Sequence, residues 1–132
     1  MSEPTTGTTE VPRDRAILRP WSEAAIETVG WDGHLVWMVS GALANSSTMT
    51  VGRCYIDEGG ANPRHYHPNC DEVLHLIQGK LRHTAGDDVV EMNPGDTISI
   101  PAGVIHNATN IGDEEAIMVI SFSSADRHTI GE

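Results

Sequence analysis

Two histidines separated by a single residue are the feature that most constrains how this chain can fold. In an extended strand, side chains at alternate positions share a face, so His65 and His67 can approach one ion together. Glu72 follows in an apolar segment that has the composition of a second strand, and His106 comes shortly after a Pro-Ala-Gly turn. Three imidazoles and one carboxylate suit a single divalent transition metal, namely Fe, Mn, Ni or Zn.

The remaining pattern favours an all-β fold. Thirteen glycines and seven prolines lie among the 132 residues, mostly between short apolar segments. Short strands of regular spacing with turn residues between them are typical of a barrel or jelly roll. We therefore expect about eight to ten strands, including segments at 31–39, 49–56, 80–85, 89–92, 96–100 and 116–122.

The spacing of these residues resembles that of the cupin family. The first cupin motif is matched by Gly59, His65, His67, Glu72 and Gly79. The second is matched by Gly95, Pro101, Gly103, His106 and Asn110. The resemblance implies a cupin double-stranded β-helix, which is a jelly-roll barrel, with the three histidines and Glu72 as metal ligands. It also implies a homodimer.

The composition of the chain limits its domain organisation and the classes of partner that it can bind. Residues 1–15 are rich in Thr, Pro and charge, so we expect a flexible N-terminal arm before a single domain at 16–132. The net charge of −11 argues against nucleic acid and anionic membranes as partners. No apolar stretch is long enough to span a bilayer and no secretory leader is evident, which predicts a cytoplasmic protein. Cys54 and Cys70 are expected to be buried thiols rather than a disulfide framework.

The other histidines are not expected to bind the metal, because the ligand set is already complete. Strand alternation puts His75 on the face opposite Glu72, where it would pack against a second sheet or subunit. His83 lies in a predicted hairpin and is expected to be exposed, and His34 is expected at a surface or rim. His128 belongs to a polar tail at 123–132 that is expected to be loose, and it has no assigned partner.

Candidates for contact with a substrate are few. Met38, Tyr55 and Phe122 are apolar or aromatic residues that could line a pocket, although ordinary core packing is the more common role of such residues. Arg53 could hold a carboxylate if its face of the 49–56 strand looks inward, but both faces of that strand carry apolar residues. The pattern therefore leaves the orientation of this strand open.

Three functions remain compatible with this ligand set. The first is an oxygenase of the dioxygenase type, in which a small organic substrate and dioxygen meet at the metal. The second is a redox-neutral isomerase or lyase, in which the metal acts only as a Lewis acid. The third is a non-enzymatic module that binds a small molecule. The fold is common to all three, so it does not choose among them.

Overall fold

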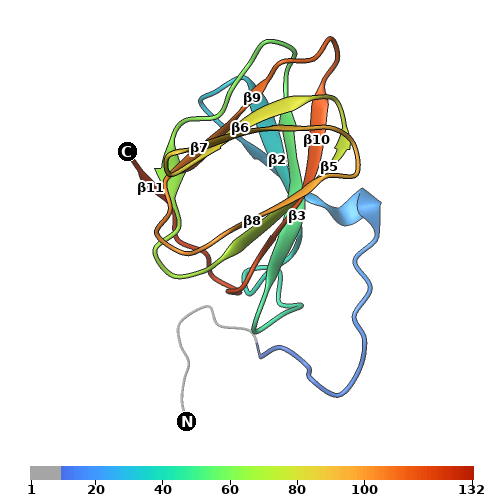
Figure 1. Cartoon of the computed structure of the whole chain (residues 1–132). Coiled ribbons are helices and arrows are strands. Elements are labelled where there is room, and N and C mark those ends of the chain that lie inside the picture. Colours follow the sequence, from blue (N-terminus) through green and yellow to red (C-terminus); the bar gives the residue numbers. More distant parts are fainter. Residues whose placement is uncertain (1–9) are drawn as a thin grey trace.

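Short apolar segments separated by glycine and proline turns form two antiparallel sheets that close around a common interior (Figure 1). The computed structural model describes residues 10–132. In that part of the chain it contains one 3-10 turn and eleven strands: η1 (Trp21–Glu23), β1 (Ala25–Thr28), β2 (Gly33–Val39), β3 (Thr50–Ile56), β4 (His65–Tyr66), β5 (Glu72–Gln78), β6 (Leu81–Ala85), β7 (Asp88–Met92), β8 (Thr97–Ile100), β9 (His106–Asn110), β10 (Ala116–Phe122) and β11 (Ile130–Gly131).

The strand order explains how the two sheets meet. The first sheet has the order β1-β2-β3-β10-β5-β8, and the second has the order β11-β4-β9-β6-β7. Neighbours that are distant in sequence, such as β3 and β10, produce the crossovers of a jelly roll. The all-β jelly-roll prediction is confirmed. The strand count exceeds the expected eight to ten because β1 and the two-residue strand β11 have little sequence signal.

Alternation along β10 and β5 builds the core. β10 turns Ala116, Met118, Ile120 and Phe122 inward between β3 and β5, and all four are buried. On β5, residues 72, 74 and 76 are buried, as expected from the sequence. Since a fully buried Leu or Met side chain contributes about 1.5–3 kcal/mol, this central pair of strands supplies a large part of the stability.

The orientation of β3, which the sequence left open, is settled by its neighbours. Cys54 and Ile56 face the interior and belong to the core cluster. Tyr55 stacks on His34 of β2 with ring centroids 4.4 Å apart, and the guanidinium of Arg53 lies 4.9 Å from the centroid of the Trp21 ring. Arg53 and Tyr55 therefore lie on the outer face of the sheet.

The C-terminal segment is fixed against the barrel, so the expectation of a loose tail was wrong. The Thr50 hydroxyl donates to the Ser124 carbonyl at 2.7 Å, and the Asn69 side chain donates to the Asp126 carbonyl at 2.9 Å. β11 then pairs with β4. This anchoring could not be predicted from the sequence, because the tail is polar and polar side chains anchor a segment only when specific partners are in place.

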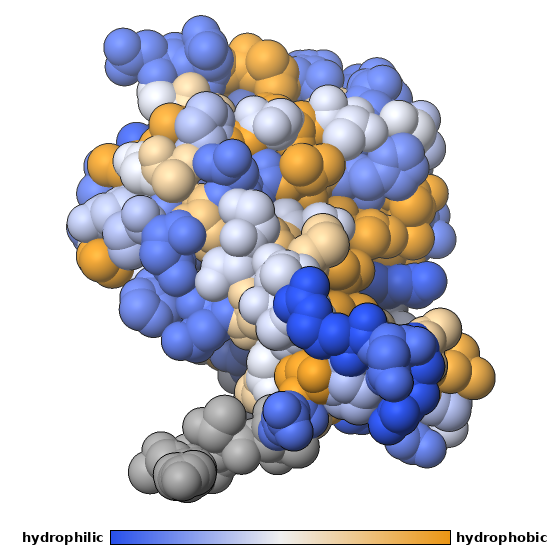
Figure 2. All heavy atoms as spheres, turned by 90° about the horizontal axis from the view of Figure 1, so that it is seen from below, coloured by the Kyte–Doolittle hydropathy of each residue, from blue (hydrophilic) through white to orange (hydrophobic). Residues whose placement is uncertain are grey.

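The outside of the molecule carries apolar as well as polar residues. In the view of Figure 2, orange apolar residues gather toward the right side and are interspersed with blue polar ones. Within residues 10–132, no helix has the length and apolar character needed to cross a membrane. Most of the predicted arm, residues 1–9, lies outside the described residues, and the domain boundary at residue 16 stays a prediction.

Candidate metal centre

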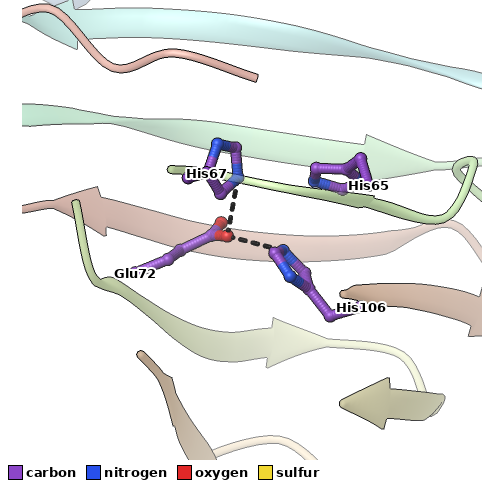
Figure 3. Close-up of side chains that lie close together, drawn as sticks. All are labelled: His65, His67, Glu72 and His106. Atoms are coloured by element: carbon purple, nitrogen blue, oxygen red, sulfur yellow. Dashed lines mark hydrogen bonds and ion pairs between the residues drawn. The ribbon is translucent and has the colours of Figure 1, made fainter. Parts of the chain in front are cut away.

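The four predicted ligands converge from three strands of both sheets. His65 lies on β4 opposite His106 on β9, and His67 follows directly after β4. Glu72 begins β5 in the other sheet, so the group lies between the sheets inside the barrel. Their ligand atoms all lie within 4.8 Å of one another. Figure 3 shows the Glu72 carboxylate between His67 and His106, with His65 beside them.

Backbone carbonyls orient all three imidazoles in the same way. The Nδ1–H of His65 donates to the Pro63 carbonyl at 2.7 Å, that of His67 to the His128 carbonyl at 2.8 Å, and that of His106 to the Val104 carbonyl at 2.9 Å. Because a carbonyl oxygen only accepts, each Nδ1 must carry the proton. The Nε2 atoms are thereby left as the metal-facing nitrogens, an arrangement typical of histidine ligands.

One buried nitrogen in this group has no hydrogen-bond partner. Among the described residues, His67 Nε2 is such an atom, although it lies 3.2 Å from Glu72 Oε1. With the proton on Nδ1, both of these atoms are acceptors that face each other. A cation bound between them would satisfy both, so these residues fit a divalent metal.

The electrostatics of the group are dominated by the buried carboxylate. Burial alone would raise the pKa of Glu72, but the imidazoles of His106 and His67 outweigh burial and lower that pKa to about 2. Burial opposes charge on His106, but the Glu72 carboxylate, 2.9 Å from Nε2, favours a second proton on the metal-free ring and raises the pKa of His106 on balance. Burial lowers the pKa of His65. Glu72 is therefore ionised across the neutral range, as a ligand carboxylate must be.

A small cavity of about 220 Å³ gives access to this group. His65 and Glu72 lie at its base, and its walls are largely apolar and aromatic, formed by Trp31, Leu35, Trp37, Leu74 and Phe122. Arg127 and Thr129, both from the C-terminal segment, complete the lining together with residues of the 62–65 segment. The cavity thus combines an apolar wall with one edge of the candidate metal site.

Arg127 is a residue of this cavity that the sequence did not single out. Its guanidinium lies 4.3 Å from the ring centroid of Trp37 and 5.2 Å from that of Phe122. Glu27 is 3.9 Å away, and only 18% of the Arg127 side chain is exposed. Burial lowers the pKa of Arg127, which nevertheless remains a cation at neutral pH. Its position depends on the fold of the tail, so no local motif could have revealed it.

The predicted substrate contacts fare unevenly. Phe122 lines the cavity. Arg53 and Tyr55 are corrected, because the alternation of β3 turns Cys54 toward the cavity and these two residues outward. Met38 is corrected for the same reason, since its neighbour Trp37 on β2 lines the cavity instead. Cys54 and Cys70 are both free and buried, as expected.

The other histidines have distinct environments. His83 was predicted to be exposed but is 1% exposed, because β6 turns it into the barrel interior. The ring of His75 hydrogen-bonds through Nδ1 to the Thr97 hydroxyl at 2.8 Å, on the face of β5 opposite Glu72. His128 contributes its backbone carbonyl to His67, and its own ring lies 3.5 Å from Asp126.

Comparison with known proteins agrees with this geometry. The family described as "Cupin domain" matches residues 52–122. Germin-like protein 3-8 of Oryza sativa is 32% identical over 61% of the chain, and oxalate oxidase 1 of Hordeum vulgare is also 32% identical over 61% of it. These alignments span 38% and 44% of the two relatives, so the chain covers less than half of their length.

Solved structures resemble the fold as well. A structure of Bacillus subtilis oxalate decarboxylase, described as containing Mn(II) centres, superposes with a TM-score of 0.70 at 24% sequence identity. The match covers 76% of this chain and 28% of the decarboxylase. At this level of identity the likeness establishes the fold alone.

Proposed function

The chain belongs to the cupin family, and on that basis we propose that it is a metal-dependent enzyme that acts on a small organic molecule with dioxygen as co-substrate. The observation that carries the proposal is the set of three imidazoles, each with Nδ1–H bound to a backbone carbonyl, whose Nε2 atoms surround the Glu72 carboxylate. A cavity reaches this set from outside. Such access distinguishes a reactive metal from a structural one.

We propose His65, His67, Glu72 and His106 as the ligands of one divalent ion, which is Fe, Mn, Ni or Zn. Four protein ligands leave one or two positions free on a five- or six-coordinate metal. A bound redox metal would supply electron transfer between substrate and dioxygen. Mn is supported by the Mn(II) centres described for the structurally similar decarboxylase.

The lining of the cavity supports a small organic acid as the substrate. Arg127 would pair with the substrate carboxylate, and Thr129 beside it would offer a hydroxyl. Trp37 and Phe122 hold the guanidinium in place and exclude water from the site. The names of the oxalate oxidase and oxalate decarboxylase relatives make oxalate the first substrate to try.

Two alternatives remain in view. A redox-neutral lyase or isomerase would use the same ligands, and the decarboxylase neighbour belongs to such a class by its name. A non-enzymatic module would bind the organic acid without turnover. The oxygen-dependent reaction is placed first because a relative called oxalate oxidase is 32% identical, whereas the decarboxylase is 24% identical.

A measurement of oxygen uptake distinguishes the oxygen-dependent enzyme, the lyase or isomerase, and the binding module. The full chain is stripped of metal, reloaded separately with Mn(II), Fe(II), Ni(II) or Zn(II), and mixed with oxalate in an oxygen electrode. The proposal expects uptake with a redox metal and none with Zn(II). Turnover that persists without oxygen and with Zn(II) would identify a lyase or isomerase. Thermal stabilisation by oxalate without any turnover would identify a binding module.

We also propose that residues 16–132 form a single domain, and that the protein is a cytoplasmic homodimer without nucleic-acid or membrane partners. Exposed apolar residues on the first sheet and the segment before it support the dimer, among them Leu18, Trp21, Ile26, Val73 and Ile77. Analytical ultracentrifugation of the full chain tests it, and a monomer at micromolar concentration would refute it.

A further inference from the structure

A second cavity lies at the seam where the two sheets end. β7 is the last strand of one sheet and β8 the last strand of the other (Figure 1). Residues of both strands line the cavity, which has a volume of about 770 Å³. Ligand-binding clefts usually measure about 300–1,000 Å³. It shares no lining residue with the cavity beside the metal ligands.

The lining of this seam cavity includes a buried histidine that lacks hydrogen-bond partners. His83 is 1% exposed, and neither ring nitrogen has a hydrogen-bond partner among the described residues. Its ring stacks on that of His106, a candidate metal ligand outside the cavity lining, with centroids 5.9 Å apart and planes inclined by 14°. A buried imidazole without partners is rare, because its lost hydration is not replaced.

The chemistry of His83 defines what could satisfy it. A neutral imidazole offers one N–H donor and one nitrogen acceptor. A hydroxyl group can satisfy either nitrogen, because it both donates and accepts.

The rest of the lining restricts the ligand further. The walls are mostly aliphatic and include Val89, Val90, Ile98, Pro101 and Val104. Asp87 and Asp88 lie at the β6–β7 turn and form part of the same lining. Two carboxylates at the cavity disfavour an anion, and the aliphatic walls favour an apolar body.

We propose that the seam cavity is a second ligand site, which takes a small neutral molecule with an apolar body and one hydroxyl group that hydrogen-bonds to His83. The site is independent of the candidate metal and of the reaction proposed above. Its occupant reaches the protein through the gap between β7 and β8 and stops at the His83 ring. The His83–His106 stack then places this occupant next to a metal ligand without contact with the metal.

Phenol is a suitable test ligand, because it combines an aromatic body with one hydroxyl group. In a titration of the full-length, metal-free chain followed by amide NMR, phenol is expected to shift the resonances of β7 and β8 saturably. Benzoate, which has the same ring but a negative charge, is expected to bind at least tenfold more weakly. Shifts confined to residues around Trp37, or equal binding of benzoate, would overturn the assignment.

Two variants test the residues that define the site. His83→Phe keeps a planar ring but removes both nitrogens, and it is expected to weaken phenol binding at least tenfold. His75→Phe, the same change on the outer face of β5, is expected to leave binding unchanged. Val90→Trp changes a residue that is 40% exposed at the mouth and should block entry while retaining His83. Unchanged affinity in both His83→Phe and Val90→Trp would refute the proposal.

Crystals of the unmodified chain soaked in phenol test whether phenol binds at His83, even if the variants do not fold. The expected result is a phenol oxygen within about 3.2 Å of a His83 ring nitrogen. Two results would overturn the proposal: a cavity that contains water only, or phenol bound at crystal concentration only, without saturable shifts in solution.

Discussion

His67 is oriented by the backbone of His128, whose carbonyl oxygen accepts the Nδ1–H of His67 at 2.8 Å. The two residues are 61 positions apart, and the second lies in the polar C-terminal segment. The Asn69 side chain holds that segment at two points, donating to the Asp126 carbonyl and accepting from the His128 amide, both at 2.9 Å. The tail therefore acts as the outer support of a candidate metal ligand.

Asn69→Ala is expected to weaken metal binding although Asn69 is not a ligand. Without both hydrogen bonds the His128 carbonyl is no longer held in place, and His67 loses its fixed tautomer and orientation. Changes at such supporting residues typically cost about 10–100-fold in metal affinity. Isothermal titration calorimetry with Mn(II) measures the metal affinity of the variant. Asn93→Ala, at an exposed turn, is the matched control, and equal affinity of the two variants would contradict the role of the tail.

Alanine at His67 or His106 is expected to abolish metal loading while the barrel stays folded. Each change removes one of four donors that lie within 4.8 Å of one another. The core around Met118 and Leu76 does not depend on these rings. Elemental analysis after metal reconstitution is the measurement, with circular dichroism as a check of folding. His75→Ala, on the outer face of β5, should load metal normally. If both ligand variants retained stoichiometric metal, the ligand assignment would be wrong.

Arg127→Leu is expected to weaken the binding of oxalate to the metal-loaded chain about 10–100-fold. A hydrogen bond to a charged group is worth about 1.5–3 kcal/mol, and 1.4 kcal/mol corresponds to a factor of ten. Arg53→Leu is the control, since Arg53 lies on the outer face of β3 against Trp21. Calorimetric titration of both variants compares them. A larger loss of oxalate affinity in Arg53→Leu than in Arg127→Leu would indicate that oxalate binds on the outer face of β3 and not in the cavity.

The contrast between these two arginines shows what the sequence could and could not predict. The resemblance to the cupin motifs predicted the barrel and the grouping of His65, His67, Glu72 and His106, whereas strand alternation by itself accounts for the shared face of His65 and His67. Arg127 becomes part of the cavity only after the tail folds back, which requires partners such as Asn69 and Thr50 that are distant in sequence.

The sequence left the orientation of β3 open for a related reason. On β3 both faces carry apolar residues, since Tyr55 packs on His34 outside while Cys54 and Ile56 pack inside. The sequence alternation therefore has two equivalent solutions, and the tertiary neighbours choose between them. His83 was misplaced because a histidine in a hairpin is usually solvated, whereas β6 continues into the barrel with Leu81 and His83 both buried.

Cys54 is expected to react slowly with iodoacetamide well above pH 9. Burial, reinforced by the Glu72 carboxylate, raises the pKa of its thiol to about 12, despite the opposing charge of Arg127. At pH 9 the folded thiol is then about 0.1% ionised, whereas an unfolded thiol with a pKa of about 8.5 is about three-quarters ionised. Because the folded pKa is the higher one, this group lowers the stability of the fold as pH rises from about 9 toward 12.

The reactivity of Cys54 is measured in the Cys70→Ser variant, in which Cys54 is the one thiol. Mass spectrometry follows its alkylation by iodoacetamide over time. The rate in the folded protein should rise about tenfold per pH unit between pH 8 and 10, with no plateau near pH 9. The same variant in urea should show that plateau. A folded protein that is alkylated at the urea rate at pH 9 would contradict the burial of this thiol.

Gly79→Ala is expected to destabilise the fold more than Gly95→Ala, although both glycines have positive φ angles, of +93° and +98°. The unfavourable backbone conformation costs each variant about 1–3 kcal/mol. Only at Gly79 would the added Cβ also collide with a neighbour, at 2.9 Å from the Ala116 Cα of β10, whereas nothing lies within 4 Å at Gly95. Overpacking of this kind adds about 1–3 kcal/mol, and urea denaturation of the two variants measures the difference. Equal urea midpoints of the two variants would contradict this prediction, because they would mean that β10 moves away from the end of β5 at no cost. Ala116 is fully buried and packs closely against Gly79, so we expect no such movement.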